Sequence, residues 1–121
     1  MQITQVHIRA YSSHKSNYRE PRTDGMKTFV EGTAIKFTIV LDTISVDTCT
    51  ITIDDPVQNP IIEAAGMTQE ADYVYSYVYQ TVAAHFGKGH WLVTFKATVG
   101  AKTALTQDVF NLADNRRIGN T

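Results

Sequence analysis

Apolar and polar residues alternate with a period of two along most of the chain. In residues 33–41, TAIKFTIVL, every second position is apolar: Ile35, Phe37, Ile39 and Leu41. Residues 48–54 and 90–99 repeat the pattern, and residues 108–112 show a shorter run of it with Phe110 and Leu112. Successive side chains of a strand point to opposite faces, so each run has one apolar and one polar face. The sequence therefore predicts an all-β fold built from antiparallel sheets with one wet face.

Turn-forming residues interrupt these runs at intervals of about ten residues. They are EGT at 31–33, DDPVQNP at 54–60, GKGH at 87–90 and VGAKT at 99–103. Only residues 60–72 could hold a helical turn, and this segment is too short to form a helical layer. Short strands with no helices between them indicate a β-sandwich or a β-barrel.

The chain of 121 residues fits a single domain. We expect residues 1–28 to hold an N-terminal strand and a polar arm, and residues 29–113 to form the sandwich. Residues 114–121, DNRRIGNT, have no apolar period and are expected to be a C-terminal tail.

Charge and composition exclude several classes of partner. The formal net charge of -1 provides no field that would attract nucleic acid or an anionic membrane, so neither is expected as a partner. The residues after Met1 contain no apolar signal-peptide stretch, and no run approaches the ~20 apolar residues of a membrane span. If Met1 is the native start, we expect a protein that is made and stays inside a cell, or that leaves it as part of something assembled there. The single cysteine excludes an intramolecular disulfide and a thiolate metal cluster.

No group of residues predicts catalysis, a metal or a cofactor. His85 and His90 flank a glycine turn but lack a third ligand, so solvated turn residues are favoured over a zinc site. Asp54 and Asp55 end a strand next to a proline, which favours a structural turn over a calcium site. Cys49 lies between threonines in a β-rich run, so we expect a buried structural thiol and not a nucleophile.

Residues 72–81, DYVYSYVYQT, place four tyrosines on one face of a predicted strand. They could fill the core or form an exposed platform for a ligand. The tyrosine face offers more apolar area than the opposite face, so Tyr75 and Tyr77 are expected in the core. Tyr73 and Tyr79 lie nearer the strand ends and are candidate rim aromatics. The opposite face is then a candidate interface, formed by Val74, Ser76, Val78 and Gln80.

From residue 29 onward, the order of landmarks resembles an immunoglobulin-like β-sandwich module of the kind found in phage structural proteins and prokaryotic surface proteins. The segments that carry the resemblance are FVEGTAIKFTI, TCTITIDDP, EAAGMTQEADYVYSY, GKGHWLVTFKAT and VFNL, which span about two thirds of the chain. The resemblance implies an antiparallel immunoglobulin-like β-sandwich of about seven strands. The paired cysteines of antibody-type domains are absent, which excludes a disulfide-stapled extracellular receptor domain.

These observations suggest a non-enzymatic structural or interaction module. The resemblance implies a phage virion component, such as a decoration, neck or tail accessory protein, located in the virion after assembly in the host cytoplasm. The polar arm and the tail, with Arg116 and Arg117, would dock on neighbouring subunits in a multi-copy assembly. The alternative is a carbohydrate- or cell-surface-binding module that stacks its ligand on Tyr73, Tyr79 or Trp91.

Overall fold

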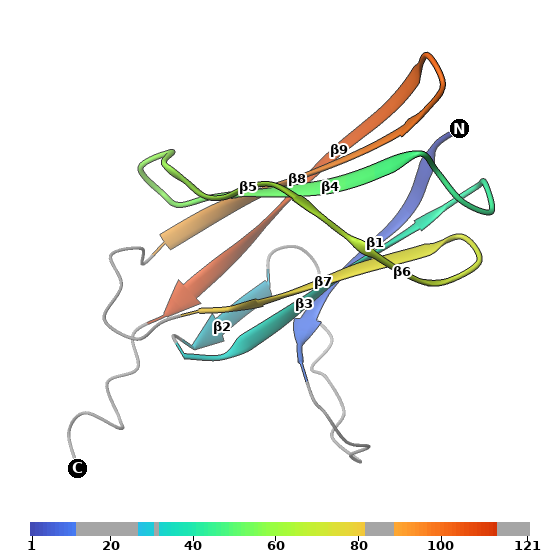
Figure 1. Ribbon diagram of the computed structural model, residues 1–121. Helices are drawn as coiled ribbons and strands as arrows, with labels where there is room; N and C mark the ends of the chain where they lie inside the picture. The colour runs from blue at the N-terminus through green and yellow to red at the C-terminus, as the bar shows by residue number, and fades with distance from the viewer. Residues whose placement is uncertain (12–26, 31, 82–88, 114–121) are drawn as a thin grey trace, which may run out of the picture.

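A computed structural model of the protein describes residues 1–11, 27–30, 32–81 and 89–113 (Figure 1). These residues form nine strands: β1 (Ile3–Ala10), β2 (Lys27–Val30), β3 (Ala34–Leu41), β4 (Thr48–Asp54), β5 (Pro60–Gly66), β6 (Thr68–Ala71), β7 (Val74–Gln80), β8 (Gly89–Val99) and β9 (Lys102–Ala113). Within these ranges there is no helix long and apolar enough to cross a membrane.

The strands form two sheets that face each other (Figure 1). One sheet has the strand order β1-β3-β7-β6, and the other has the order β2-β9-β8-β4-β5. All neighbouring strands run antiparallel except β2, which lies parallel to β9 with Lys27 opposite Phe110. The pairing of β8 with β9 is the longest, from Gly89 opposite Leu112 to Val99 opposite Lys102.

The period-two pattern of the sequence builds the core. In β3 and in β4 every second residue is buried, and these buried residues point toward the opposite sheet. Burial of one face of each sheet against the other removes both apolar faces from water, which is the main favourable term in folding. The buried apolar residues are Ile8, Ile35, Phe37, Ile39, Leu41, Cys49, Ile51, Ile53, Tyr75, Tyr79, Trp91, Val93, Phe95, Ala97, Phe110 and Leu112.

An aromatic cluster lies at the centre of this core. The ring of Phe37, from the β1-β3-β7-β6 sheet, lies 6.4 Å from that of Phe95 and 5.7 Å from that of Phe110, both on the facing sheet. Trp91 stacks on Phe110 at 5.7 Å, and Phe29 of β2 meets the same ring edge-on at 6.1 Å. These contacts join both sheets through one set of rings.

The structure confirms the prediction of an all-β fold, and its two facing sheets are consistent with a β-sandwich. It has nine strands in the described ranges, so the expected number of about seven is not confirmed. Residues 60–72, which could have held a helical turn, form β5 and β6 instead. The last part of the expected polar arm, Lys27 and Thr28, belongs to β2. The rest of the arm, and the tail at 114–121, lie outside the described residues.

The central position of Phe37 leads to a test of the core. Phe37→Ala should lower the free energy of unfolding by about 3–5 kcal/mol, because it removes a fully buried ring that touches the facing sheet. Urea denaturation followed by tryptophan fluorescence measures the change. Val57→Ala, at a side chain that is 71% exposed, should change stability by less than about 0.5 kcal/mol. Equal effects of the two substitutions would contradict this description of the core.

Candidate functional site: the outer face of the β1-β3-β7-β6 sheet

The four tyrosines of residues 72–81 have different environments. Tyr75 and Tyr79 are buried, at 6% and 9% exposure, and Tyr77 is half-buried against the core. The core prediction for Tyr75 is confirmed, and its hydroxyl accepts a hydrogen bond from the backbone N–H of Val46 at 3.0 Å. The prediction that Tyr79 is a rim aromatic is wrong, because its ring packs 6.4 Å from that of Trp91 inside the sandwich.

Tyr73 alone among them is exposed, at 41%. It precedes β7 and lies in the turn that joins β6 to β7. The in-and-out alternation of the strand therefore does not determine the direction of its side chain. Its backbone has a φ of 74°, in the left-handed region that side chains other than glycine rarely adopt. The tight turn therefore turns this ring outward while the other three tyrosines follow the pleat of β7.

This difference predicts unequal roles in stability. Tyr79→Ala should lower the free energy of unfolding by about 3 kcal/mol or more, since a buried ring is lost. Tyr73→Ala should change it by about 1 kcal/mol or less, since the ring is largely in water. Chemical denaturation of the two variants, side by side, measures both values. A larger loss for Tyr73→Ala would show that the exposed ring supports the fold.

The predicted interface on β7 is partly accessible. Val78 is 42% exposed and Gln80 is exposed, whereas Val74 is half-buried. Ser76 is buried, at 5% exposure, because the side chain of Glu70 covers it and accepts its hydroxyl hydrogen bond at 2.8 Å. The structure thus leaves Val78 and Gln80 available for contact and removes Ser76 from the surface.

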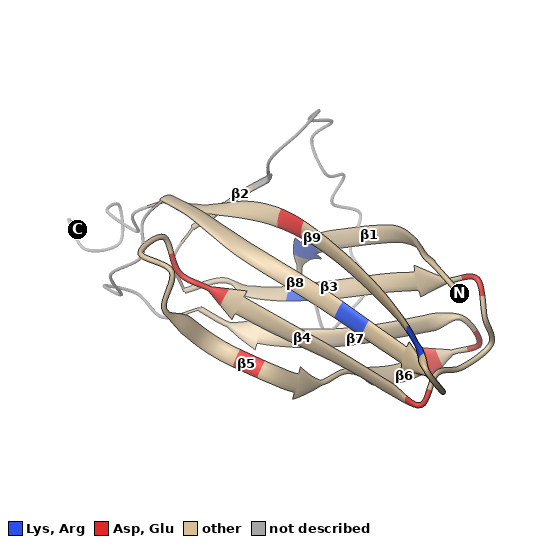
Figure 2. Cartoon of the chain, turned by 90° about the horizontal axis from the view of Figure 1, so that it is seen from above, with Lys and Arg blue, Asp and Glu red and all other residues tan. Residues whose placement is uncertain are grey.

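Charged residues have an uneven distribution over the molecule (Figure 2). Acidic residues occur mainly where strands end, with Asp42, Asp47 and Asp72 at one end of the sandwich and Asp54 and Asp55 at the other. On the β1-β3-β7-β6 sheet, by contrast, cationic side chains occupy neighbouring strands. Its outer face therefore differs in charge from the loops at its ends.

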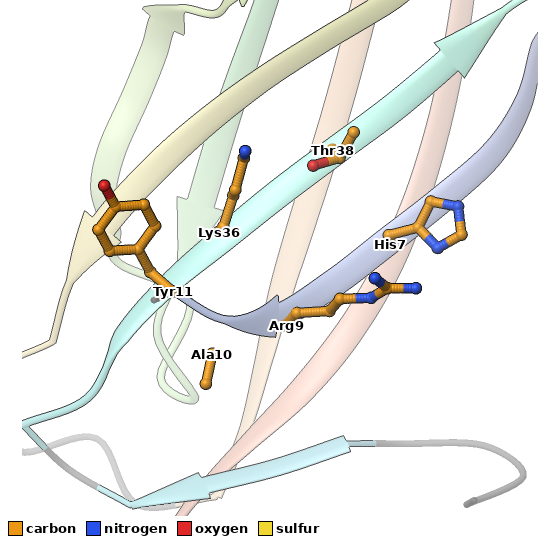
Figure 3. A pocket seen from close by; sticks show the side chains of 6 residues that line it. All are labelled: His7, Arg9, Ala10, Tyr11, Lys36 and Thr38. Atoms are coloured by element: carbon orange, nitrogen blue, oxygen red, sulfur yellow. The ribbon is translucent and has the colours of Figure 1, made fainter. Parts of the chain in front are cut away.

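Pairing between β1 and β3 brings these cationic side chains together. Arg9 lies opposite Lys36, and His7 lies opposite Thr38. With Ala10 and Tyr11, these residues line an open hollow of about 360 Å³ (Figure 3). Lys36 in turn lies opposite Val78 of β7, so the hollow and the accessible part of the β7 interface form one surface. We call this surface the outer face; it consists of His7, Arg9, Tyr11, Lys36, Thr38, Val78 and Gln80.

An ion pair crosses this face. Lys36 Nζ lies 2.8 Å from Glu70 Oε2, and the hydrogen bonds that Lys36 and Ser76 donate lower the pKa of the Glu70 carboxyl. The carboxylate is thus charged at neutral pH and offsets the charge of Lys36. Beside this pair, the exposed Val78 and Tyr11 add apolar area to the face. A surface of this composition can hold another molecule by combined apolar and charge contacts.

The residues weighed for metal binding have other roles or lie apart. Asp55 is buried, and its carboxylate accepts hydrogen bonds from the backbone N–H groups of Val57 and Asn59 at 3.0 and 2.8 Å. The prediction that this aspartate shapes the turn is confirmed. His90 is exposed on β8, and His85 lies outside the described residues. In the described ranges, no three histidine, cysteine or acidic side chains gather as a metal site would require.

Cys49 is buried, as predicted, with its Sγ 3.7 Å from Sδ of Met67. Burial raises the pKa of its thiol to about 11, because the thiolate would lose its hydration. At neutral pH the sulfur is therefore protonated and unreactive.

The buried thiol gives a second test. At pH 8, Ellman's reagent should label Cys49 only as fast as the protein opens, since the folded state offers neither access nor thiolate. The labelling rate should rise steeply with urea and reach the rate of a free thiol in the unfolded chain. Rapid labelling in native buffer, at the rate of the unfolded control, would contradict the burial of this side chain.

Sequence reasoning found the β7 side of the outer face but missed the β1 side. The signal was present in VHIRAY, residues 6–11, where His7, Arg9 and Tyr11 alternate with apolar residues. What the sequence lacked was the register that sets Arg9 beside Lys36. The two other candidate interface residues, Arg116 and Arg117, lie outside the described residues.

The chain matches no protein family and no curated protein sequence.

Proposed function

We propose that this protein is a non-enzymatic, immunoglobulin-like interaction module that docks on a neighbouring protein through its outer face. The observation that carries the proposal is the composition of that face. Tyr11 and Val78, at 45% and 42% exposure, lie on either side of a hollow that contains Arg9 and Lys36. Apolar side chains in water beside cationic ones are typical of surfaces that another protein covers.

The order of the strands supports an immunoglobulin-like topology. In that fold, strands A, B, E and D form one sheet, and strands G, F and C form the other. Strands β1, β3, β7 and β6 take the places of A, B, E and D, and β9, β8 and β4 take those of G, F and C. This accounts for seven of the nine strands. β5 then corresponds to the C′ strand of variable-type domains, and β2 is an addition beside the last strand.

The role in a phage virion rests on the resemblance of residues 29–113 to modules of phage structural proteins. In such a role the chain would be one of many copies attached to other virion proteins. The partner surface would offer apolar area to Val78 and Tyr11, and polar groups to the charged side chains beside them. Such a contact would be sensitive to salt, because part of it is electrostatic.

The test is incorporation into particles. Virions purified from a host infected with the phage that encodes the chain should contain it in stoichiometric amounts, measured by quantitative mass spectrometry. Its absence from particles that otherwise assemble would exclude a virion role.

Val78→Asp should then separate folding from docking. The substitution places a charge on exposed apolar area. The protein should therefore still fold, but its amount per particle should fall by about tenfold or more. Leu105→Asp, at a side chain 64% exposed on β9 of the other sheet, is the matched control and should incorporate normally. Circular dichroism checks the fold of both variants. Normal incorporation of Val78→Asp would exclude the outer face as the docking surface.

Carbohydrate binding is the second candidate, favoured only by the exposed ring of Tyr73. The other two rings proposed for stacking, Tyr79 and Trp91, are buried at 9% and 1% exposure. Of the three rings proposed for stacking, Tyr73 is therefore the one that could serve, and one ring offers a small platform. A glycan array that shows binding lost in Tyr73→Ala would support this function, and an array without hits would exclude it.

A further inference from the structure

One end of the sandwich presents two large apolar side chains to water. Ile44, in the connection from β3 to β4, is 53% exposed, and Tyr73, in the turn from β6 to β7, is 41% exposed. They are neighbours, because the backbone N–H of Tyr73 donates to the carbonyl of Ile44 at 2.9 Å. The exposed Asp42 and Asp72 accompany them, one in each connection. We call these four residues the loop-end patch.

The loops that carry the patch are held in place by hydrogen bonds. Asp42 Oδ1 accepts from the backbone N–H of Gln2 at 2.8 Å. Gln69 Nε2 donates to the carbonyl of Ile44 at 2.8 Å, in addition to the bond from Tyr73. A surface that is ordered before a partner arrives loses little conformational entropy on binding.

The backbone of Tyr73 adopts a conformation that is rare for a residue with a side chain. Its φ of 74° costs about 1–3 kcal/mol in a residue other than glycine. Glycine or asparagine would adopt this turn more readily. Either residue would keep the two backbone hydrogen bonds of this position, from its N–H to the carbonyl of Ile44 and from the N–H of Leu41 to its carbonyl. A strained residue that holds an aromatic ring in water suggests that the ring is used for contact.

The charge of the patch indicates the chemistry of its partner. Asp42, Asp47 and Asp72 gather at this end of the sandwich, where Figure 2 shows acidic residues near the N-terminus. The contacts of Asp42 and Asp47 are backbone N–H groups, and none of the three forms an ion pair with another described residue. The patch therefore fits a segment that combines cationic side chains with an apolar one.

The chain contains such a segment. Arg116, Arg117 and Ile118 follow β9 in the sequence NRRI, with two positive charges directly before an aliphatic side chain. Ile118 would cover Ile44 and the ring of Tyr73 while the arginines meet the aspartates.

Geometry excludes binding of this segment to the patch of its own copy. β9 begins at the loop end, where the N–H of Asp47 donates to the carbonyl of Thr98, and Thr98 lies opposite Thr103. Ala113 lies ten residue steps beyond Thr103 along the strand, or about 33 Å. Ile118 is five residues beyond Ala113 and reaches at most about 18 Å from it. The segment can therefore reach only the patch of another copy.

From these observations we infer that Arg116–Ile118 of one copy binds the loop-end patch of a second copy, which joins the chains head to tail. Such a heterologous contact uses different surfaces on the two copies, so it propagates into chains or rings. It leaves the outer face free, and it goes beyond the proposed function because it concerns contacts between copies of this protein. Its small size predicts weak association in isolation.

Sedimentation velocity of the purified full chain tests the inference. The average mass should rise from 13.5 kDa with concentration, up to about 1 mM, and fall back when salt is raised. Asp72→Lys and Arg117→Glu should each abolish the rise, and the double variant should restore it, because the exchanged charges attract again. Glu63→Lys and Lys96→Glu make the same charge changes at exposed sites away from the patch and should have no effect.

Mixing gives the sharper result. A variant with a disabled patch, Asp72→Asn with Tyr73→Ser, and a variant with a disabled tail, Arg116→Gln with Arg117→Gln, should each remain monomeric. Their mixture should form dimers that grow no further, because only one productive contact exists. A monomeric wild-type chain at all concentrations, association unaffected by these changes, or a mixture that stays monomeric would each overturn the inference.

Success or failure here does not depend on the proposed function, because the experiment uses the purified chain alone. The particle experiment measures docking through the outer face and uses Val78→Asp, which leaves the patch and the tail intact. The two ideas can therefore fail separately.

Discussion

The contact of Phe37 with Phe95 and Phe110 joins the two sheets, and the rest of the structure depends on it. Antibody-type domains join their two sheets by a disulfide. This chain has one cysteine and no such link among its described residues, so packing of rings must hold β3 against β8 and β9. Trp91 of β8 and Phe29 of β2 pack on Phe110 from the two neighbours of β9, and the contact of Phe29 anchors the parallel strand β2.

One face of each sheet is buried in the core. A binding partner can therefore contact only the outer faces of the sheets and the loops at the ends of the sandwich. These two kinds of surface differ in charge. The outer face of the β1-β3-β7-β6 sheet places Arg9 beside Lys36, whereas Asp42 and Asp72 lie in the loops at one end. A chain with a formal net charge of -1 therefore holds neighbouring cationic side chains on one sheet and acidic side chains in the loops at one end. Net charge alone gave no indication of this separation, since it sums over the whole molecule.

Much of the fold followed from alternation, and the failures have identifiable causes. The strands at residues 34–41, 48–54 and 89–99 were predictable, because a strict period of two has one structural explanation. β5 and β6 were missed because Pro60, Ala64 and Gly66 weaken the apolar-polar alternation of this segment. The register shifts in the β4–β5 ladder also break the alternation along β5. Tyr79 was misplaced because a position near a strand end is exposed only if no element covers it. Here Trp91, from the facing sheet, covers it.

The sequence by itself determined the fold class, the turn at Asp55, the burial of Cys49 and the division of β7 into a core face and an outer face. All of these depend on neighbours along the chain, through the period of a strand and the hydrogen bonds of a turn. Only the tertiary structure decided which tyrosine stays in water, that Arg9 lies beside Lys36, and that Ile44 and Tyr73 share one end of the molecule. Arg9 and Lys36 are 27 positions apart and Ile44 and Tyr73 are 29 apart, so register and loop geometry bring them together.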